Sequence, residues 1–218
     1  MIFTPSVACA NPLHYARDID ELIAAGITVL HYDIMDGHMV KNFALSPDIL
    51  REMKAAYPTM TFDVHAMLTE PLAFVQNLAD SGASWLTFHQ KAGRISETID
   101  AIHNAGMKAG LALNPDEALE SLYPYLARLD LVLVMGIQPG FPGRPMAEGT
   151  LERIAGLASL RESKGYAYRI IIDGGADNST AAALQQAGVD IMVLGYRSLF
   201  RQPVSIADAL TLTRNSMG

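Results

Sequence analysis

One short phrase returns along this chain and limits its possible folds more than any other feature. An amphipathic segment ends at a glycine, and a run of aliphatic or β-branched residues follows at once. The phrase reads AAGI, DSGAS, NAGMK and QAGVD, with its glycine at Gly26, Gly82, Gly106 and Gly188. Because glycine caps helix ends and short aliphatic runs form buried strands, each repeat predicts a helix followed by a strand.

Strand–helix units of this kind fill the whole chain of 218 residues. The expected strands are 2–8, 27–33, 60–67, 84–89, 107–113, 129–135, 168–173 and 189–195. The expected helices are 13–25, 47–56, 71–81, 94–105, 116–127, 147–163, 178–187 and 203–214. Eight units predict an α/β fold, the TIM (β/α)8 barrel, whereas the alternative, an open flavodoxin-like sheet, needs only about five or six strands. No linker or change of composition divides residues 1–218, so we expect one domain.

Composition and charge exclude several classes of partner. The formal net charge of −7 and the absence of a Lys/Arg cluster argue against a nucleic-acid surface or an anionic membrane. No apolar run reaches membrane-spanning length, and the N-terminal residues lack a basic signal-peptide region. The single cysteine, Cys9, excludes an internal disulfide and fits a reducing compartment. We therefore expect a cytoplasmic protein without nucleic-acid or membrane partners.

Polar side chains stand at the carboxyl ends of several predicted strands, where such barrels carry their active sites. His31 and Asp33 lie two apart on one strand and therefore share a face, while His65 and Asp173 end two others. Any single strand histidine is more often a core residue satisfied by neighbours. Two imidazoles and two carboxylates at one end instead predict a site for one divalent ion, Zn²⁺, Fe²⁺, Mn²⁺ or Co²⁺.

Glycine-rich loops follow the last three predicted strands. They are 136-GIQPGFPGRP-145, 173-DGGAD-177 and 195-GYRSLF-200. Glycine lets backbone N–H groups approach an anion, and barrels of this type hold phosphate near strands seven and eight. Ordinary turns explain each loop taken alone, but three at the same end favour a phosphate site. A metal, two carboxylates and a phosphate site together indicate proton transfer at a carbon next to a carbonyl of a small phosphorylated substrate.

The segment HYDIMDGHMVKN, residues 31–42, closely resembles the strand-two signature of the ribulose-phosphate 3-epimerase family. Further matching segments occur in family order at the expected strand ends. They are PSVACANP, DVHAML, LTFHQKA, GLALNP, LVLVMGIQPGFPG, IIDGG and LGYRSLF. The resemblance implies a TIM barrel that uses a divalent metal ion to epimerise C3 of a ketose phosphate, and it implies a homo-oligomer.

The resemblance also implies a role for each matching residue. Asp33 and Asp173 become the catalytic acid/base pair, and metal binding falls to His31, Asp33, His65 and Asp173. Substrate contacts fall to Ser6, His65, Met35, Met67 and Met135, although plain core packing also explains methionines in a chain that has eleven of them. Phosphate binding falls to Gly140, Phe141, Pro142, Gly143, Gly174, Gly175, Gly195 and Tyr196.

The chain departs from the usual family pattern where the distal end of the substrate is expected. The changed residues are Lys41, Lys91, Gly136, Gln138, Pro142, Arg144, Tyr196 and Arg197. Pro142 removes a backbone N–H donor, and Arg144 adds a positive charge. The metal and proton-transfer residues are all retained.

Three functions follow, in order of preference. The first is epimerisation of D-ribulose 5-phosphate to D-xylulose 5-phosphate in pentose phosphate metabolism. The second is the same reaction on the hexulose D-allulose 6-phosphate, and the third is a barrel that binds sugar phosphates without catalysis. Binding alone needs no pair of carboxylates, which argues against the third. Related phosphate barrels that decarboxylate their substrates carry a DxKxxD pattern, and DIMDGH lacks its lysine.

Overall fold

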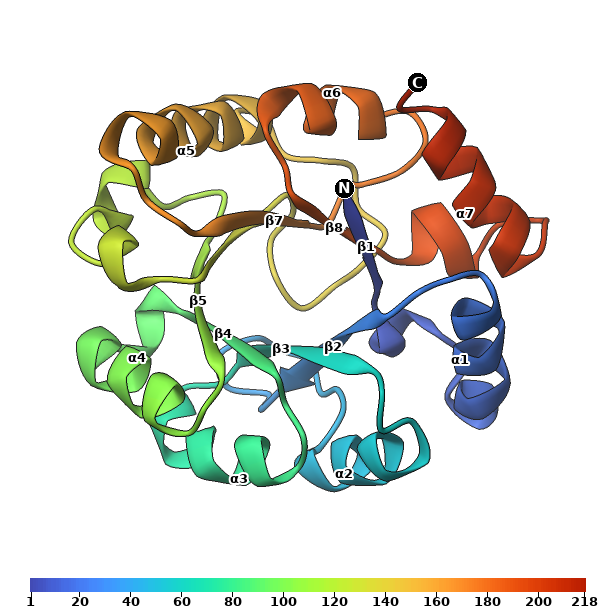
Figure 1. Cartoon of the computed structure of the whole chain (residues 1–218), viewed down its shortest axis with the longest axis horizontal. Coiled ribbons are helices and arrows are strands. Elements are labelled where there is room, and N and C mark those ends of the chain that lie inside the picture. The colour runs from blue at the N-terminus through green and yellow to red at the C-terminus, as the bar shows by residue number, and fades with distance from the viewer.

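The computed structural model describes residues 1–218 and contains eight strands arranged around a central axis (Figure 1). The strands are β1 Ile2–Pro5, β2 Val29–Met35, β3 Thr61–Met67, β4 Trp85–His89, β5 Lys108–Leu113, β6 Leu131–Met135, β7 Arg169–Asp173 and β8 Ile191–Leu194. The helices are α1 Tyr15–Ala24, α2 Pro47–Ala56, α3 Val75–Asp80, α4 Ile95–Asn104, α5 Thr150–Lys164, α6 Ala181–Ala187 and α7 Ile206–Asn215. The helices surround the strands on the outside.

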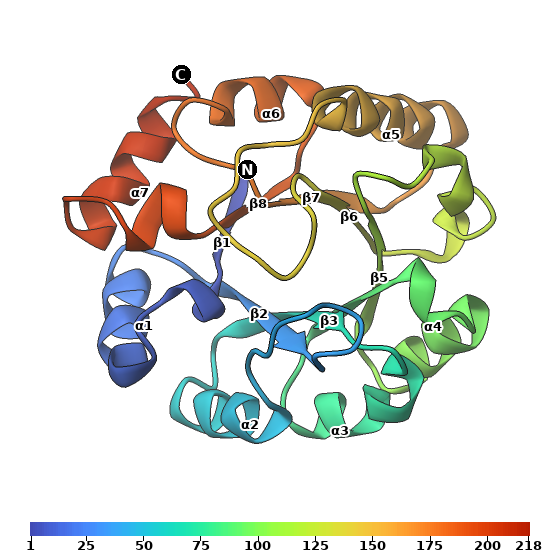
Figure 2. The same cartoon turned by 180° about the vertical axis from the view of Figure 1, so that it is seen from behind.

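Every strand pairs in parallel with its neighbours, in the order β1-β8-β7-β6-β5-β4-β3-β2. An isolated parallel bridge between Ser6 and His31 brings β1 against β2 and completes the circle. The predicted TIM barrel is therefore confirmed, and an open sheet is excluded. Seen from the other side, the long loop between β6 and α5 crosses the barrel opening (Figure 2). None of the helices is both long and apolar enough to cross a bilayer.

Alternation along the strands decides which residues enter the barrel. On β2, Leu30, Tyr32 and Ile34 belong to the main hydrophobic core between strands and helices. Because successive strand side chains point to opposite faces, His31 and Asp33 point inward. The same rule turns the polar residues of β3 inward.

The two halves of the barrel interior differ in polarity. Apolar side chains fill the interior along β5 to β8: Ala112, Leu131, Leu133, Ile171, Ile191 and Val193. Buried polar side chains line the interior along β1 to β4: Thr4, His31, Asp33, Asp63, His65, Thr87 and His89. A polar half of this kind is costly unless its groups are paired or bind a ligand.

Local chemistry explains where several helices begin. Helix α7 follows Ser205, whose hydroxyl accepts a hydrogen bond from the backbone N–H of Asp208 at 3.1 Å. Helix α2 follows Ser46 and starts at Pro47, a residue whose fixed φ suits the first helical position. Both starts agree with the expected ranges to within a few residues.

The expected helix at 116–127 is wrong. The structure has two short 3₁₀ turns there, Leu119–Leu122 and Leu126–Arg128. Pro124 lies between them, and a proline in a helix interior removes one hydrogen bond and clashes with the preceding turn. The expected strand at 2–8 is also too long, because it ends at Pro5 and a 3₁₀ turn, Val7–Cys9, follows.

Candidate active site

Four side chains from three strands converge at one end of the barrel interior. His31 and Asp33 come from β2, His65 from β3 and Asp173 from the end of β7. One potential ligand atom from each lies within 4.8 Å of the other three. The structure thus brings together the four residues that the sequence predicted as metal ligands.

The distances define which atoms face one another. Asp33 Oδ1 lies 3.4 Å from His31 Nε2 and 3.2 Å from His65 Nδ1. Asp173 Oδ2 lies 3.8 Å from His31 Nε2 and 3.3 Å from His65 Nδ1. Two imidazole nitrogens and two carboxylate oxygens therefore point at one small volume.

The residues present fit a divalent cation. His31 Nε2 is buried and has no hydrogen-bond partner in the structure. An unpaired buried nitrogen is costly, and coordination of a cation would satisfy it together with the two carboxylates. A mixed set of two nitrogens and two oxygens suits Zn²⁺, Fe²⁺, Mn²⁺ or Co²⁺.

The histidines and carboxylates of the cluster shift one another's pKa values. Burial alone opposes protonation of His31, but the carboxylates of Asp33 and Asp63 raise its pKa well above the usual value. Burial likewise opposes the charge on Asp33, and His31 and His65 outweigh it, so the pKa of this carboxyl lies well below its ordinary range. Because protons and a metal ion compete for the same lone pairs, the cluster is one site that holds positive charge.

Each of the two histidines is held by a second buried residue that sequence reasoning missed. His31 Nδ1 lies 2.8 Å from Asp63 Oδ2, and His65 Nε2 lies 2.8 Å from His89 Nε2. The signal for Asp63 was available, since a charged residue two positions before His65 on the same strand shares its face. His89 was visible only as another histidine at a strand end.

Ser6 holds one oxygen of Asp33. Its hydroxyl donates a hydrogen bond of 2.7 Å to Asp33 Oδ2, which leaves Oδ1 to face the histidines. Ser6 follows β1 directly, so the bridge that completes the barrel also delivers this hydroxyl to the site. Sequence analysis assigned Ser6 to the substrate, and the structure adds this contact to the carboxylate.

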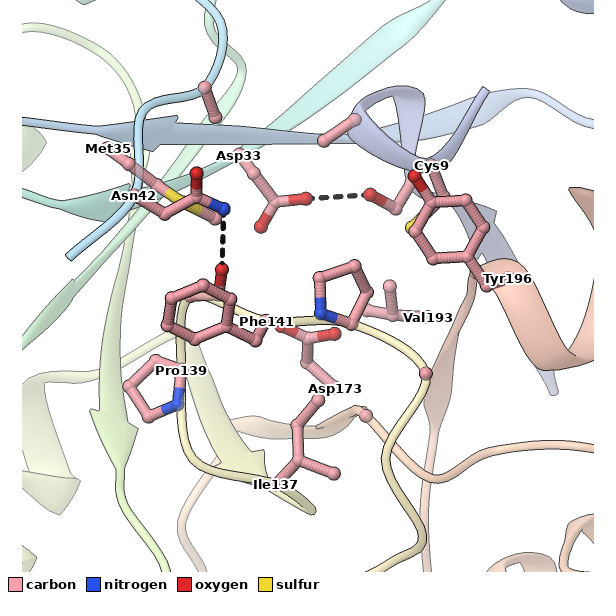
Figure 3. A pocket seen from close by; sticks show the side chains of 18 of the residues that line it. Cys9, Asp33, Met35, Asn42, Ile137, Pro139, Phe141, Asp173, Val193 and Tyr196 are labelled. Atoms are coloured by element: carbon pink, nitrogen blue, oxygen red, sulfur yellow. Dashed lines mark hydrogen bonds between the residues drawn. The ribbon is translucent and has the colours of Figure 1, made fainter. Parts of the chain in front are cut away.

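A cavity of about 400 Å³ opens above the cluster. Asp33 and Asp173 point into it, and Met35 lies on its wall (Figure 3). Met67 and Met135 also line it, and their contact with a substrate stays a prediction. His31 and His65 are fully buried beneath the cavity, so a direct contact of His65 with substrate stays a prediction.

The glycine-rich loops form the other wall of the same cavity. All eight residues predicted to bind phosphate line it: Gly140, Phe141, Pro142, Gly143, Gly174, Gly175, Gly195 and Tyr196. Gly174 has φ +90°, and a Cβ there would lie 2.4 Å from Ile137 Cγ1. Only glycine fits this position without movement of its neighbours.

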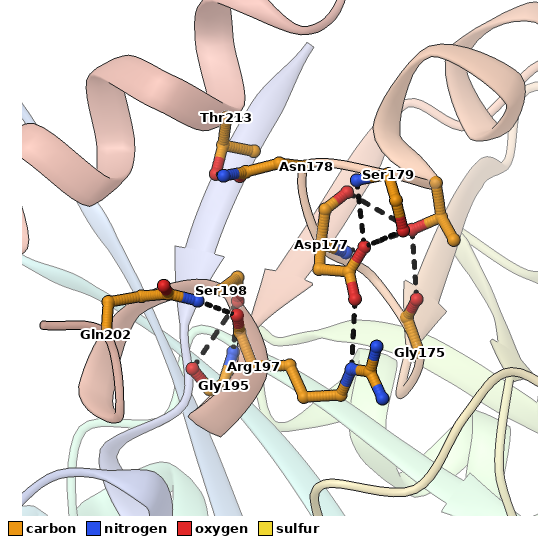
Figure 4. Close-up of polar contacts among 10 residues, drawn as sticks. Gly175, Asp177, Asn178, Ser179, Gly195, Arg197, Ser198, Gln202 and Thr213 are labelled. Atoms are coloured by element: carbon orange, nitrogen blue, oxygen red, sulfur yellow. Dashed lines mark hydrogen bonds and ion pairs between the residues drawn. The ribbon is translucent and has the colours of Figure 1, made fainter.

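Two contacts hold these loops in place. Asn42 Nδ2 donates a hydrogen bond of 2.7 Å to the carbonyl oxygen of Gly140, which ties the loop after β2 to the loop after β6 (Figure 3). Arg197 Nε donates to Asp177 Oδ2 at 2.9 Å, across the loops after β8 and β7 (Figure 4). Arg197 lines the cavity, and its two Nη groups make no hydrogen bond within the protein.

Comparison with known proteins gives a consistent result. A sequence model described as "Ribulose-phosphate 3 epimerase family" matches residues 2–200. The ribulose-phosphate 3-epimerase of Treponema pallidum (strain Nichols) is 35% identical over 192 residues, which make up 88% of each chain. The enzyme of the same name from Serratia marcescens is 32% identical over 203 residues, or 93% of this chain and 96% of that protein.

A solved structure, 3-hexulose-6-phosphate synthase from Salmonella typhimurium, has a TM-score of 0.72 to this chain and covers 100% of it and 98% of its own length. At 15% identity this likeness shows the shared barrel alone. The family match, in contrast, includes every residue of the four-residue cluster and of the glycine-lined wall. The chain belongs to the ribulose-phosphate 3-epimerase family.

Proposed function

We propose that this protein is a metal-dependent epimerase that inverts C3 of a ketose phosphate. The observation that carries the proposal is the position of Asp33 and Asp173 on the floor of a cavity whose opposite wall is built from glycine loops. Two carboxylates allow a proton to leave one face of a carbon and return to the other. Inversion requires this pair, whereas binding of a sugar phosphate does not.

In the proposed reaction one of the two carboxylates accepts the proton from C3. The other, carrying a proton, delivers it to the opposite face, and the two exchange roles in the reverse direction. Ser6 orients Asp33 through the hydrogen bond to Oδ2, and the lowered pKa of Asp33 keeps its carboxylate anionic, which is the form that can accept a proton. A bound divalent ion supplies Lewis-acid stabilisation of the negative charge that develops on the substrate oxygens.

The residues that hold the ion in this proposal are His31, Asp33, His65 and Asp173. The methionines Met35, Met67 and Met135 cover the reacting carbon with polarisable, apolar sulfur atoms and exclude water from it. Exclusion of water strengthens the electrostatic interactions in the site.

At the distal end, the proposed phosphate ligands are backbone groups of Gly140, Gly143, Gly174, Gly175 and Gly195. Arg197 adds a charged donor, because Asp177 occupies only its Nε and leaves both Nη groups available. The side chains of Phe141, Pro142 and Tyr196 complete the wall. Pro142 has no N–H to offer, and a guanidinium can compensate for that missing donor.

The proposed substrate pair is D-ribulose 5-phosphate and D-xylulose 5-phosphate, and the relatives named ribulose-phosphate 3-epimerase support a ribulose phosphate as one of the two. Metal-loaded protein incubated with ribulose 5-phosphate in D₂O is expected to exchange the C3 hydrogen and to form xylulose 5-phosphate. The same assay with D-allulose 6-phosphate separates pentulose from hexulose specificity through the ratio of kcat/KM. Binding of both sugars without exchange would favour a barrel that binds but does not catalyse, and would refute the proposal.

A further inference from the structure

His65 contacts a buried histidine outside the four-residue cluster through its second ring nitrogen, Nε2. His89 sits at the end of β4, is 1% exposed, and places its Nε2 2.8 Å from His65 Nε2. The ring centroids are 5.0 Å apart, and the planes differ by 29°. Two rings so arranged meet nitrogen to nitrogen, edge to edge, in the geometry of a hydrogen bond.

We infer that His89 and Asn114 are positioning residues, which fix His65 in the form that has its proton on Nε2 and a bare lone pair on Nδ1. The inference rests on the proposed function, because it concerns the nitrogen that faces the proposed metal ion. Neither residue touches the substrate or the ion in this assignment. Both act through His65.

The argument begins with the proton shared by the two rings. A contact of 2.8 Å between imidazole nitrogens needs one donor and one acceptor, since two bare lone pairs or two N–H groups repel each other. Nδ1 of His65 faces the Asp33 and Asp173 carboxylates and must be bare to bind a cation. The proton of His65 therefore stands on Nε2, and His89 Nε2 accepts it.

Asn114 completes the chain of hydrogen bonds. When His89 accepts at Nε2, its own proton stands on Nδ1 and requires an acceptor. Asn114 is 3% exposed, and its buried Oδ1 has no hydrogen-bond partner in the structure. In this assignment the unpaired oxygen of Asn114 is the acceptor for the proton on His89 Nδ1.

The position of Asn114 is itself fixed by the fold. Asn114 follows β5, which pairs with β4 so that His89 lies beside Ala112. Its backbone N–H donates to Glu117 Oε2 at 2.8 Å. His65, His89 and Asn114 therefore follow one another across β3, β4 and β5. Neither His89 nor Asn114 lines the substrate cavity.

The first experiment measures the proton directly. Protein with ¹⁵N-labelled histidine is loaded with Zn²⁺, and the nitrogen shifts and couplings of His65 and His89 are recorded by NMR. The expected result is a proton on His65 Nε2, a metal-bound Nδ1, and a coupling across the hydrogen bond to His89 Nε2. A His65 ring that binds Zn²⁺ through Nε2, or whose proton has no coupling to His89, would overturn the inference.

The second experiment measures metal affinity by competition of Zn²⁺ with a chelator. His89→Phe keeps the ring shape and removes the acceptor, so we expect affinity to fall about 10- to 100-fold, as for other residues that orient metal ligands. His89→Gln retains an acceptor oxygen and is expected to recover most of the loss. Asn114→Leu is expected to show a smaller decrease, because it acts one hydrogen bond further away.

The matched control is His103→Gln, which changes an exposed histidine outside the barrel and is expected to leave affinity unchanged. Equal losses in His89→Phe and His89→Gln would show that packing alone matters, and unchanged affinity in His89→Phe would also contradict the inference. If His89→Phe does not fold, His89→Gln, Asn114→Leu and the NMR spectrum still decide. Failure of the proposed function looks different, since the wild-type protein itself would then neither bind metal nor exchange the C3 proton.

Discussion

The two ends of the cavity are built in different ways. At the proposed metal end, His31, Asp33 and His65 are side chains on paired strands, and each is at most 7% exposed. At the proposed phosphate end, loops supply glycines, and Phe141 is 45% exposed. The metal end is thus fixed by a buried hydrogen-bonded network, and the phosphate end by backbone shape and a few surface contacts.

This difference agrees with the sequence analysis, in which most departures from the resembled family pattern fall at the proposed phosphate end. A side chain in the buried network has partners on several sides, so one substitution leaves unpaired polar groups in a water-free interior. Changed residues at the phosphate end, such as Pro142, Arg144 and Arg197, have access to solvent. We expect substitutions at the metal end to lower the catalytic rate, and substitutions at the phosphate end to change substrate specificity.

The largest effect is expected from Asp173→Asn, which removes one member of the proton-transfer pair and keeps its shape. Loss of a general acid or base lowers rates by about 10² to 10⁴, so kcat and C3 exchange in D₂O should both fall within that range. Substrate binding should change far less. A variant with kcat near wild type would show that the metal end does not carry the proton transfer.

Asp63→Asn tests the support beneath His31. The amide keeps the shape of Asp63 but lacks the charge that raises the pKa of His31. We expect Zn²⁺ affinity to fall about 10- to 100-fold. Competition with a chelator measures the change, and circular dichroism checks that the barrel stays folded. An unchanged affinity would mean that the orientation of His31 depends on packing alone.

Arg197→Gln probes the phosphate end. Removal of one charged hydrogen-bond donor should raise KM for the ketose phosphate about tenfold, which corresponds to about 1.4 kcal/mol, with kcat nearly constant. Arg201→Gln is the control, since Arg201 stacks on Tyr196 and lies outside the main cavity. A fall in kcat at constant KM would place Arg197 with the catalytic end and would undo the contrast between the two ends.

The smallest effect is expected at Asp36, which organises the loop after β2. Its carboxylate accepts hydrogen bonds from the backbone of His38, Met39 and Thr69, and these lower its pKa to about 2. A pKa below that of the unfolded chain contributes stability above about pH 4, and this contribution is lost as the pH falls toward 2.

Asp36→Asn should therefore lower Tm near pH 6, and its difference from wild type should shrink as the pH approaches 3. Thermal scans of both proteins across that range measure the gap. A difference in Tm that stays constant across this pH range would mean that the charge of Asp36 does not stabilise the loop.

Much of the fold was predictable because its signals are local. Strand runs such as those at β2 and β3, and glycines at helix ends such as Gly188, depend on residues close in sequence. The expected helix at 116–127 failed because the strand–helix rhythm was given more weight than Pro124, which interrupts the segment.

For the site, the sequence by itself determined which residue types stand at the strand ends: His31, Asp33, His65 and Asp173. Only the tertiary structure decided which atoms of those residues face one another, and that Asp63 and His89 hold the two histidines from behind. A linear pattern records spacing along one strand, but a hydrogen bond between neighbouring strands depends on their register. That register is set when the whole barrel closes, so it cannot be predicted from any short segment of the sequence.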